Sequence, residues 1–311
     1  MSAVSKGGYK LKYQGIFNSV VLGNDIVVNS ELVHPTLNNF FGLGNTSIKS
    51  GEQSDEFYRA RYNYLQTDVL LRKRLLDMLE ISLGPSYYHY WARYSDNVNR
   101  ILSHPSQIGA DSLGIYSAKD YIGAKLKIDI NFINNELFPT RGVLWFTELS
   151  SLAGINKNNH SVTKLTSDMQ VFAPLIRPNR LVAILRMGGG RIFNNDIEYF
   201  QALNLGSNNF NRGFRKNRFS GSSMLYSDAE LRIKLFTSQS YLLPGDVGLV
   251  SFYDIGRVWY KNEHSQKWHQ SYGGGIYYAP FNLAIISATI GLSDEDALFN
   301  FSLGTKFNLT F

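Results

Sequence analysis

The amino-acid sequence predicts an all-β protein built from long antiparallel strands, and three observations lead to this. Apolar and polar residues alternate with a period of two along many segments; between 118 and 132, Lys125, Lys127 and Asp129 fall opposite the apolar side chains. These segments run for about 10 to 15 residues, whereas strands of soluble proteins average about 5 or 6. Aromatic residues gather near the segment ends, as at Tyr87 and Tyr277.

Two physical versions of this fold are compatible with the alternation. One is a soluble sheet with one buried face, as in a β-sandwich or a lipocalin-like barrel. The other is a transmembrane β-barrel, whose apolar face meets lipid and whose polar face lines a lumen. The segment length favours the barrel, because a tilted strand needs roughly 9 to 11 residues to cross a bilayer. The charged residues, 18% of the chain, also fall below the roughly 25% that is typical of soluble domains.

The expected number of strands is twelve. They lie near residues 15–33, 56–75, 78–92, 118–132, 140–152, 162–175, 180–193, 223–236, 247–260, 267–279, 282–292 and 298–311. Short connections alternate with longer polar ones. Transmembrane β-barrels show this asymmetry, with short turns on one side of the membrane and long loops on the other. The alternation changes phase between Phe17 and Ile26, and again between Tyr64 and Val69. These changes indicate facing bulges in the first two strands, or an extra hairpin that would give fourteen strands.

The composition excludes several kinds of functional site. The chain has no cysteine, which excludes a disulfide scaffold, thiolate catalysis and a cysteine-ligated metal. The six histidines are dispersed, without a Glu-flanked pair at i and i+4, so we expect no metal site and no cofactor. The net charge of +6 comes from scattered Lys and Arg, whereas a nucleic-acid-binding surface would cluster them. We therefore expect no nucleic-acid partner.

One long connection and the two strands after it carry the most specific pattern. Residues 211–221 read Asn-Arg-Gly-Phe-Arg-Lys-Asn-Arg-Phe-Ser-Gly, and residues 227–232 read Ser-Asp-Ala-Glu-Leu-Arg. Residues 251–259 read Ser-Phe-Tyr-Asp-Ile-Gly-Arg-Val-Trp and contain Gly256. Together they resemble the Arg-Gly-Phe loop and the acidic strand motifs of the BamA/TamA superfamily of outer-membrane assembly and translocation barrels, also called bacterial surface antigens.

The resemblance implies that this loop folds into the lumen, where Arg212 pairs with Glu230 and Asp254. A guanidinium inside a narrow lumen is weakly screened, so it needs carboxylates in fork geometry. Removing one partner of such a buried pair costs several kcal/mol. Gly213 would let the backbone turn without a Cβ, and Phe214 would supply an apolar wedge.

Two further segments extend the resemblance. Residues 38–45, Asn-Asn-Phe-Phe-Gly-Leu-Gly-Asn, resemble the first extracellular loop of a subgroup whose barrels follow a soluble passenger, such as a calcineurin-like phosphoesterase or a patatin-like lipase. The C-terminal strand resembles the signal by which outer-membrane barrels are recognised for insertion. Its elements would be Gly304, Phe307, Leu309 and Phe311.

The chain departs from the superfamily's major assembly factors, which have sixteen strands and N-terminal POTRA domains. We expect one transmembrane barrel domain over 1–311, with residues 194–222 folded into the lumen and no POTRA domain. The first residues lack the basic start and apolar run of a secretory signal, so the sequence is interpreted either as an intracellular chain or as a piece of a longer precursor. Arg215, Lys216 and Arg218 are interpreted as ordinary surface charges.

The function implied by the resemblance is transport or membrane integration of an attached or partner polypeptide. The expected location is the cell outer membrane. The expected partners are outer-membrane lipid, the barrel-assembly machinery for the chain's own insertion, and an upstream passenger domain. No enzyme is expected in this segment. A plugged anchor for an upstream soluble domain, catalytic or not, and a small-solute porin stay open as alternatives.

Overall fold

A computed structural model describes residues 2–4, 8–108, 114–156, 159–176, 178–194, 196–207, 210–241, 243–261, 263–281 and 283–305. One antiparallel sheet dominates these residues. Its strands, in hydrogen-bonded order, are β1 (Ser2–Val4), β2 (Gly8–Val21), β3 (Asn24–Asn39), β4 (Arg59–Leu76), β5 (Leu79–Trp91), β6 (Lys119–Ile133), β7 (Gly142–Gly154), β8 (Val162–Ile176), β9 (Leu181–Ile192), β12 (Ser223–Ser238), β13 (Gly245–Trp259), β14 (His269–Pro280), β15 (Ala284–Ser293) and β16 (Ala297–Thr305).

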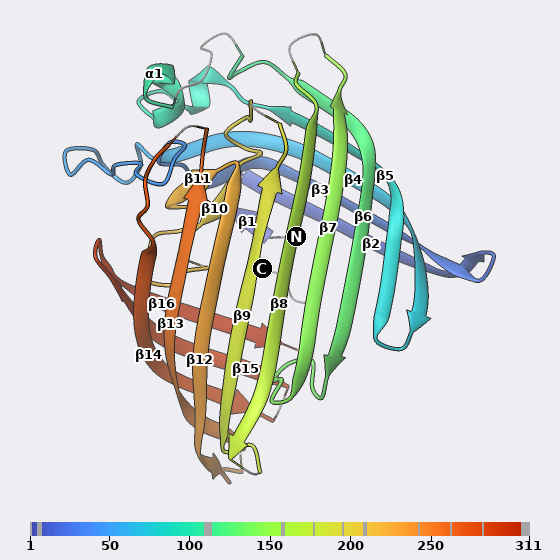
Figure 1. Cartoon of the computed structure of the whole chain (residues 1–311), viewed down its shortest axis with the longest axis vertical. Coiled ribbons are helices and arrows are strands. Elements are labelled where there is room, and N and C mark those ends of the chain that lie inside the picture. The colour runs from blue at the N-terminus through green and yellow to red at the C-terminus, as the bar shows by residue number, and fades with distance from the viewer. Residues whose placement is uncertain are drawn as a thin grey trace.

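The sheet curls around an interior (Figure 1). Strands β6 to β9 form the near wall, whereas β2 and β3 at one end and β15 and β16 at the other pass behind it. A two-stranded piece, β10 (Leu203–Leu205) and β11 (Phe219–Gly221), belongs to the connection between β9 and β12. The helical elements in the described part of the chain are short: α1 (Pro105–Ile108) and two 3₁₀ turns, η1 (Tyr94–Asp96) and η2 (Ile101–Ser103). The prediction of an all-β fold is thus confirmed.

The expected strand at 15–33 is wrong, because this segment is a hairpin of β2 and β3. Leu22 and Gly23 form its turn with φ of 49° and 78°, the left-handed pair that matches the twist of antiparallel strands. The side chain of Asn24 donates to the carbonyl of Val21 at 3.1 Å and closes the turn. The extra hairpin considered at the first phase change is therefore present, and among the described residues the sheet has fourteen strands, the three-residue β1 included. At the second phase change β4 stays continuous.

Over the described ranges, the sheet is open along one seam. The order of paired strands runs from β1 to β16, and no ladder between the described residues joins β16 to β1 or β2. The structure therefore shows a curled sheet. Hydrogen bonds that would close it into the expected barrel do not occur between the described residues. Three residues expected in the C-terminal insertion signal, Phe307, Leu309 and Phe311, lie outside the described residues.

Large apolar side chains face outward, which is the reverse of a soluble domain. Exposed examples occur on many strands: Ile122, Leu185, Leu231, Tyr253, Ile276, Phe299 and Phe301. Charged side chains on the opposite face are buried, such as Lys125, which binds Asp68 at 2.7 Å. The polar face of the alternation therefore lines the interior.

Within the described part of the chain, no helix has the length and apolar character that a membrane crossing requires.

The connection between β9 and β12 fills part of the interior. Leu205 and Phe214 are 0% exposed and Phe219 is 1% exposed. They belong to an apolar cluster that also includes side chains of β5 to β9, β12 and β13. On the far side of the loop, Tyr199 packs edge-on against Tyr62 of β4, and Phe200 stacks on Tyr90 of β5 with ring centres 4.1 Å apart. The loop thus contacts strands from β4 to β13.

Candidate functional site in the lumen

Arg212 reaches from this loop to two carboxylates on the wall of the lumen. Its Nε and Nη2 donate to the two oxygens of Asp254 in β13 at 3.0 and 2.7 Å. Its backbone N–H donates to the same carboxylate at 2.8 Å. Nη1 donates to Glu230 in β12. The structure therefore places Arg212 between the two acids named from the sequence.

The ion pairs lie away from solvent, because the side chain of Asp254 is 0% exposed, that of Glu230 13% and that of Arg212 25%. Burial alone would lower the pKa of Arg212, but the hydrogen bonds and negative charges of Asp254 and Glu230 outweigh it, so the net pKa is raised. The guanidinium stays charged, and neither carboxylate is left as a buried, unpaired anion.

An aromatic ring also contacts the guanidinium of Arg212. Its central carbon lies 3.6 Å from the centre of the Phe252 ring, a cation–π contact in a desolvated site. Glu230 also binds a second arginine, because its Oε1 accepts from Nε of Arg232 at 2.6 Å. Glu230 thus bridges the loop arginine and a strand arginine.

Gly213 lies where a side chain would not fit. A Cβ added there would be 2.5 Å from the Cβ of Ser271 and 2.8 Å from the backbone oxygen of Leu292. Its N–H donates to the hydroxyl of Ser271 at 3.1 Å, and its carbonyl accepts from the hydroxyl of Ser293 at 2.8 Å. The reason for a glycine here is this close approach to β14 and β15, and its φ is not positive.

Phe214, the third residue of the motif, is packed rather than exposed to the lumen. Its ring meets Phe219 and His269 at centre distances of 5.3 and 5.6 Å. Gly256, in strand β13 of the wall, leaves room for the loop, because a Cβ added there would lie 2.7 Å from a methyl of Leu205 in β10. The walls therefore fit closely against the loop both before Arg212 in the sequence, at Leu205, and after it, at Phe214.

Sequence reasoning missed four residues that hold this loop. Ser271 and Asn300 are polar residues on inward faces, and Asn300 donates to the carbonyl of Arg212 at 3.1 Å. Gly291 leaves room for the loop, since a Cβ there would lie 2.6 Å from that same carbonyl oxygen. Phe252 supplies the ring. Only Phe252 lies inside one of the motifs quoted above. For Ser271, Asn300 and Gly291 the sequence shows only that their positions in the strands face inward.

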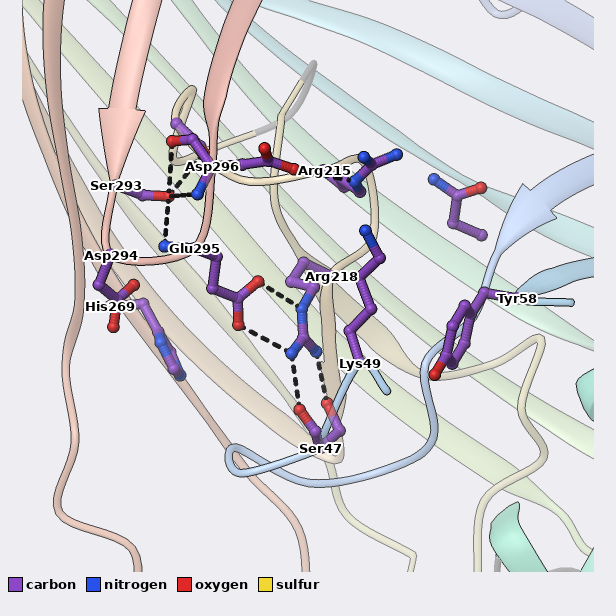
Figure 2. A network of polar contacts seen from close by, with 12 residues as sticks. Ser47, Lys49, Tyr58, Arg215, Arg218, His269, Ser293, Asp294, Glu295 and Asp296 are labelled. Carbon is purple, nitrogen blue, oxygen red and sulfur yellow. Dashed lines mark hydrogen bonds and ion pairs between the residues drawn. The ribbon is translucent and has the colours of Figure 1, made fainter. Parts of the chain in front are cut away.

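Arg218 is not an ordinary surface charge, contrary to the sequence interpretation. Its side chain is 3% exposed, and Figure 2 shows it between Glu295 and Ser47. Its Nε and Nη2 donate to the two oxygens of Glu295 at 2.7 and 2.8 Å, and Nη2 also donates to the carbonyl of Ser47 at 2.8 Å. Arg215 likewise binds Asp55 and Asp296, at 2.7 and 3.2 Å.

The segment 38–45 takes part in the same packing. The amide of Gly44 donates to the carbonyl of Ser220 at 2.8 Å. Asn45, 1% exposed, donates to the carbonyl of Lys267 at 2.8 Å and accepts from the amide of Val258 at 3.2 Å. The loop after β3 is therefore joined to β11, β13 and the segment before β14.

Among the described residues no group of three or more His, Cys, Asp or Glu side chains could hold a metal ion. Gly304, from the expected insertion signal, lies in β16 near the side chain of Leu137.

Taken together, an antiparallel sheet with an apolar outer face, curled around a loop that an arginine fixes to inward carboxylates, is typical of β-barrels with an inward-folded loop. A family comparison is more specific: the model of the Omp85 superfamily domain matches residues 18–307. The chain belongs to the Omp85 superfamily, which confirms the resemblance to the BamA/TamA barrels. Barrels of this superfamily are bacterial outer-membrane proteins that mediate the insertion or secretion of proteins.

Solved structures share the fold at low sequence identity. BamA from Haemophilus ducreyi lacking POTRA domains 1–3 matches with a TM-score of 0.64 and 14% identity, over 96% of this chain and 62% of that chain. CdiB from Acinetobacter baumannii matches with 0.59 and 13%, over 96% and 50%, and CdiB from Escherichia coli with 0.56 and 13%, over 91% and 50%. The chain therefore spans 50 to 62% of the length of these structures. No curated protein matches it.

Proposed function

We propose that this chain is the barrel domain of an outer-membrane protein that transports or integrates an attached or partner polypeptide. Membership in the superfamily supports the membrane and the substrate class. Outer-membrane lipid on the apolar face and the barrel-assembly machinery are the proposed partners. A soluble domain upstream is the proposed passenger, on the basis of the resemblance of residues 38–45 to a loop of passenger-fused barrels.

The observation that carries the proposal is the attachment of Arg212 to Asp254 and Glu230. Four donor groups of one residue, its backbone amide included, bind two carboxylates that are almost withdrawn from water. Such a set holds the loop in one position, because each half-satisfied alternative leaves a buried charge unpaired. The proposed role of the loop is to hold the barrel in its working conformation.

The plugged anchor is the second candidate, and the packing of the loop favours it over the porin. Phe214 is 0% exposed, and Tyr199 and Phe200 contact Tyr62 of β4 and Tyr90 of β5. A filled interior suits a barrel that only tethers an upstream domain. A small-solute porin would instead require an open path beside the loop.

Surface display of a passenger distinguishes transport from anchoring. A folded reporter is fused upstream of the chain, and its exposure on intact cells is measured by added protease. If the loop position is needed for transport, Arg212→Ala should lower display about tenfold or more, because each 1.4 kcal/mol of lost docking is a factor of ten. The matched control is Arg93→Ala, an arginine exposed in the connection after β5.

Each other outcome identifies a different function. The amount of folded barrel is measured in parallel, and Arg212→Lys, which keeps the charge, is used if the alanine variant does not fold. Unchanged display by a folded variant contradicts transport and supports the anchor. A large single-channel conductance of the unmodified chain in a planar bilayer would support the porin.

A further inference from the structure

The connection between β6 and β7, residues 134–141, folds inward across the lumen. The ring of Phe138 lies 5.1 Å from the ring of Tyr277 in β14, centre to centre. The guanidinium of Arg232 in β12 lies 5.0 Å above the same Phe138 ring. In the sheet order β8, β9, β12 and β13 lie between β7 and β14. The turn therefore contacts a different wall from the one that carries it.

The shape of this turn is fixed by its own side chains. Oδ1 of Asn134 accepts from the amides of Thr140 and Arg141, both at 3.0 Å. Oδ1 of Asn135 accepts from the amides of Leu137 and Phe138, both at 2.9 Å. These Asx-type bonds replace the backbone pairs that an irregular segment lacks. Phe138 is thus held in position by the turn itself.

The packing extends to the last strand. Phe138 joins a cluster with Val250, Phe252 and Tyr277 of β13 and β14. A Cβ added at Gly304 in β16 would lie 3.7 Å from a methyl of Leu137. The turn lines a cavity of about 510 Å³, and the Arg212 loop lines it as well.

We propose that residues 134–141 form a second closure of the lumen, here called the Phe138 latch, and that it is coupled to the Arg212 loop. Two contacts join them. Glu230 binds Arg212 through one oxygen and Arg232 through the other, and Arg232 lies on Phe138. Phe252 belongs to the cluster against which Phe138 packs, and its ring also lies under the guanidinium of Arg212. A path through the lumen must then displace both segments.

Coupling through a shared carboxylate has a direct consequence. Glu230 is held by Arg212 on one side and by Arg232 on the other. When Arg212 leaves, Glu230 is less constrained, and it no longer fixes the position of Arg232 on the Phe138 ring. Opening of the loop therefore weakens the latch, and by thermodynamic reciprocity opening of the latch weakens the docking of the loop by the same factor.

Cysteine labelling tests the closure, because the chain has no cysteine of its own. Ser287→Cys places one thiol on the β15 wall of the cavity, and the full chain is labelled in lipid nanodiscs with a bulky, membrane-impermeant maleimide. We expect Phe138→Ala to raise the labelling rate about tenfold, equivalent to about 1.4 kcal/mol from the lost aromatic and cation–π contacts. Phe281→Ala, a half-exposed ring on the turn after β14, is the matched control and should leave the rate unchanged.

A second variant keeps the aromatic ring. Asn135→Ala removes the two bonds that hold Phe138 in position and should also raise the rate. If both variants fold and are labelled at the rate of the Ser287→Cys parent, the closure is refuted. If Phe138→Ala does not fold, Asn135→Ala alone decides.

The coupling has its own readout in Leu137→Cys, a thiol on the latch itself. Arg212→Ala should raise the labelling of this thiol, whereas Arg93→Ala should not. An unchanged rate in Arg212→Ala refutes the coupling. Neither labelling result depends on what the barrel transports, so the latch can fail while the proposed function stands, and the reverse.

Discussion

Arg218 grips both carboxylate oxygens of Glu295, at 2.7 and 2.8 Å, while it also donates to the backbone of Ser47 (Figure 2). Ser47 follows β3, and Glu295 lies in the turn between β15 and β16. The two ends of the sheet share no ladder among the described residues. This arginine of the inward loop therefore links the two sides of the open seam.

Breaking this pair should destabilise the barrel measurably. Glu295→Ala leaves Arg218, 3% exposed, without its carboxylate, and we expect the free energy of unfolding to fall by about 3 kcal/mol. Tryptophan fluorescence during equilibrium unfolding in urea measures this. Asp196→Asn breaks an exposed pair with Lys261 and should change the free energy by less than about 0.5 kcal/mol. Equal effects of the two variants would contradict the prediction.

Gly213→Ala should displace the loop, because the new Cβ would be 2.5 Å from the Cβ of Ser271. Overpacking against a strand costs about 1 to 3 kcal/mol, and protease cleavage within the loop should become faster. Gly51→Ala is the matched control, because nothing lies within 4 Å of its added Cβ. Cleavage at the unmodified rate in Gly213→Ala would show that the close approach is not constraining.

Gly291→Ala and Gly256→Ala should differ although both glycines face the loop. At Gly291 the new methyl would meet the backbone carbonyl of Arg212 at 2.6 Å, whereas at Gly256 it would meet the flexible end of Leu205 at 2.7 Å. A side chain can rotate away and a backbone carbonyl held by hydrogen bonds cannot. We expect a loss of about 1 to 3 kcal/mol at Gly291 and a smaller loss at Gly256, measured by the same urea unfolding. The reverse order would refute this interpretation.

Phe214→Ala should be the most destabilising change in the loop. The ring is 0% exposed, and deletion of a buried Phe costs about 3 to 5 kcal/mol. The control Phe281→Ala removes a ring that is 50% exposed and should cost far less. Thermal unfolding followed by circular dichroism measures both, and similar midpoints would mean that the Phe214 site collapses around the smaller side chain.

Acid should weaken the contact between Arg215 and Asp55. Burial raises the pKa of Asp55, but the hydrogen bond from Lys49 and the charge of Arg215 outweigh it, so the net pKa lies below the ordinary 3.8. A carboxyl with a lowered folded pKa stabilises the fold above its unfolded pKa, and this contribution is lost as the pH falls through the folded pKa. The urea midpoints of the unmodified chain and Asp55→Asn should therefore differ at pH 6 and converge below pH 3.8. A difference that does not shrink as the pH falls below 3.8 would argue against an ionic origin.

The strands were largely predictable because alternation is a local property. The segment 118–132 became β6, Lys119–Ile133, since every second residue had to face the same side. The same reasoning missed the hairpin at Leu22 and Gly23. A phase change has the same appearance whether it comes from a bulge or from a turn, and the pair Leu-Gly carries no strong turn signal.

The site was predictable only where residues adjoin in sequence or resemble a known motif. Arg212, Gly213 and Phe214 are consecutive, and Glu230 and Asp254 lie in quoted strand motifs. Arg218 and Glu295 are 77 positions apart, and neither has a neighbour that distinguishes it from a solvated charge. Phe138 likewise lies in a short connection between two predicted strands, and nothing in the sequence around it indicates a contact across the lumen.

Apart from the hairpin at Leu22 and Gly23, the sequence alone determined which segments are strands and which face of each is apolar, because both follow from residue order and the two-residue repeat. The tertiary structure decided which distant residues meet inside: Arg212 with Asp254, Arg218 with Glu295, and Phe138 with Tyr277. These contacts depend on the curl and register of the whole sheet, which place residues far apart in the chain at the same height of the lumen. No local pattern encodes that height.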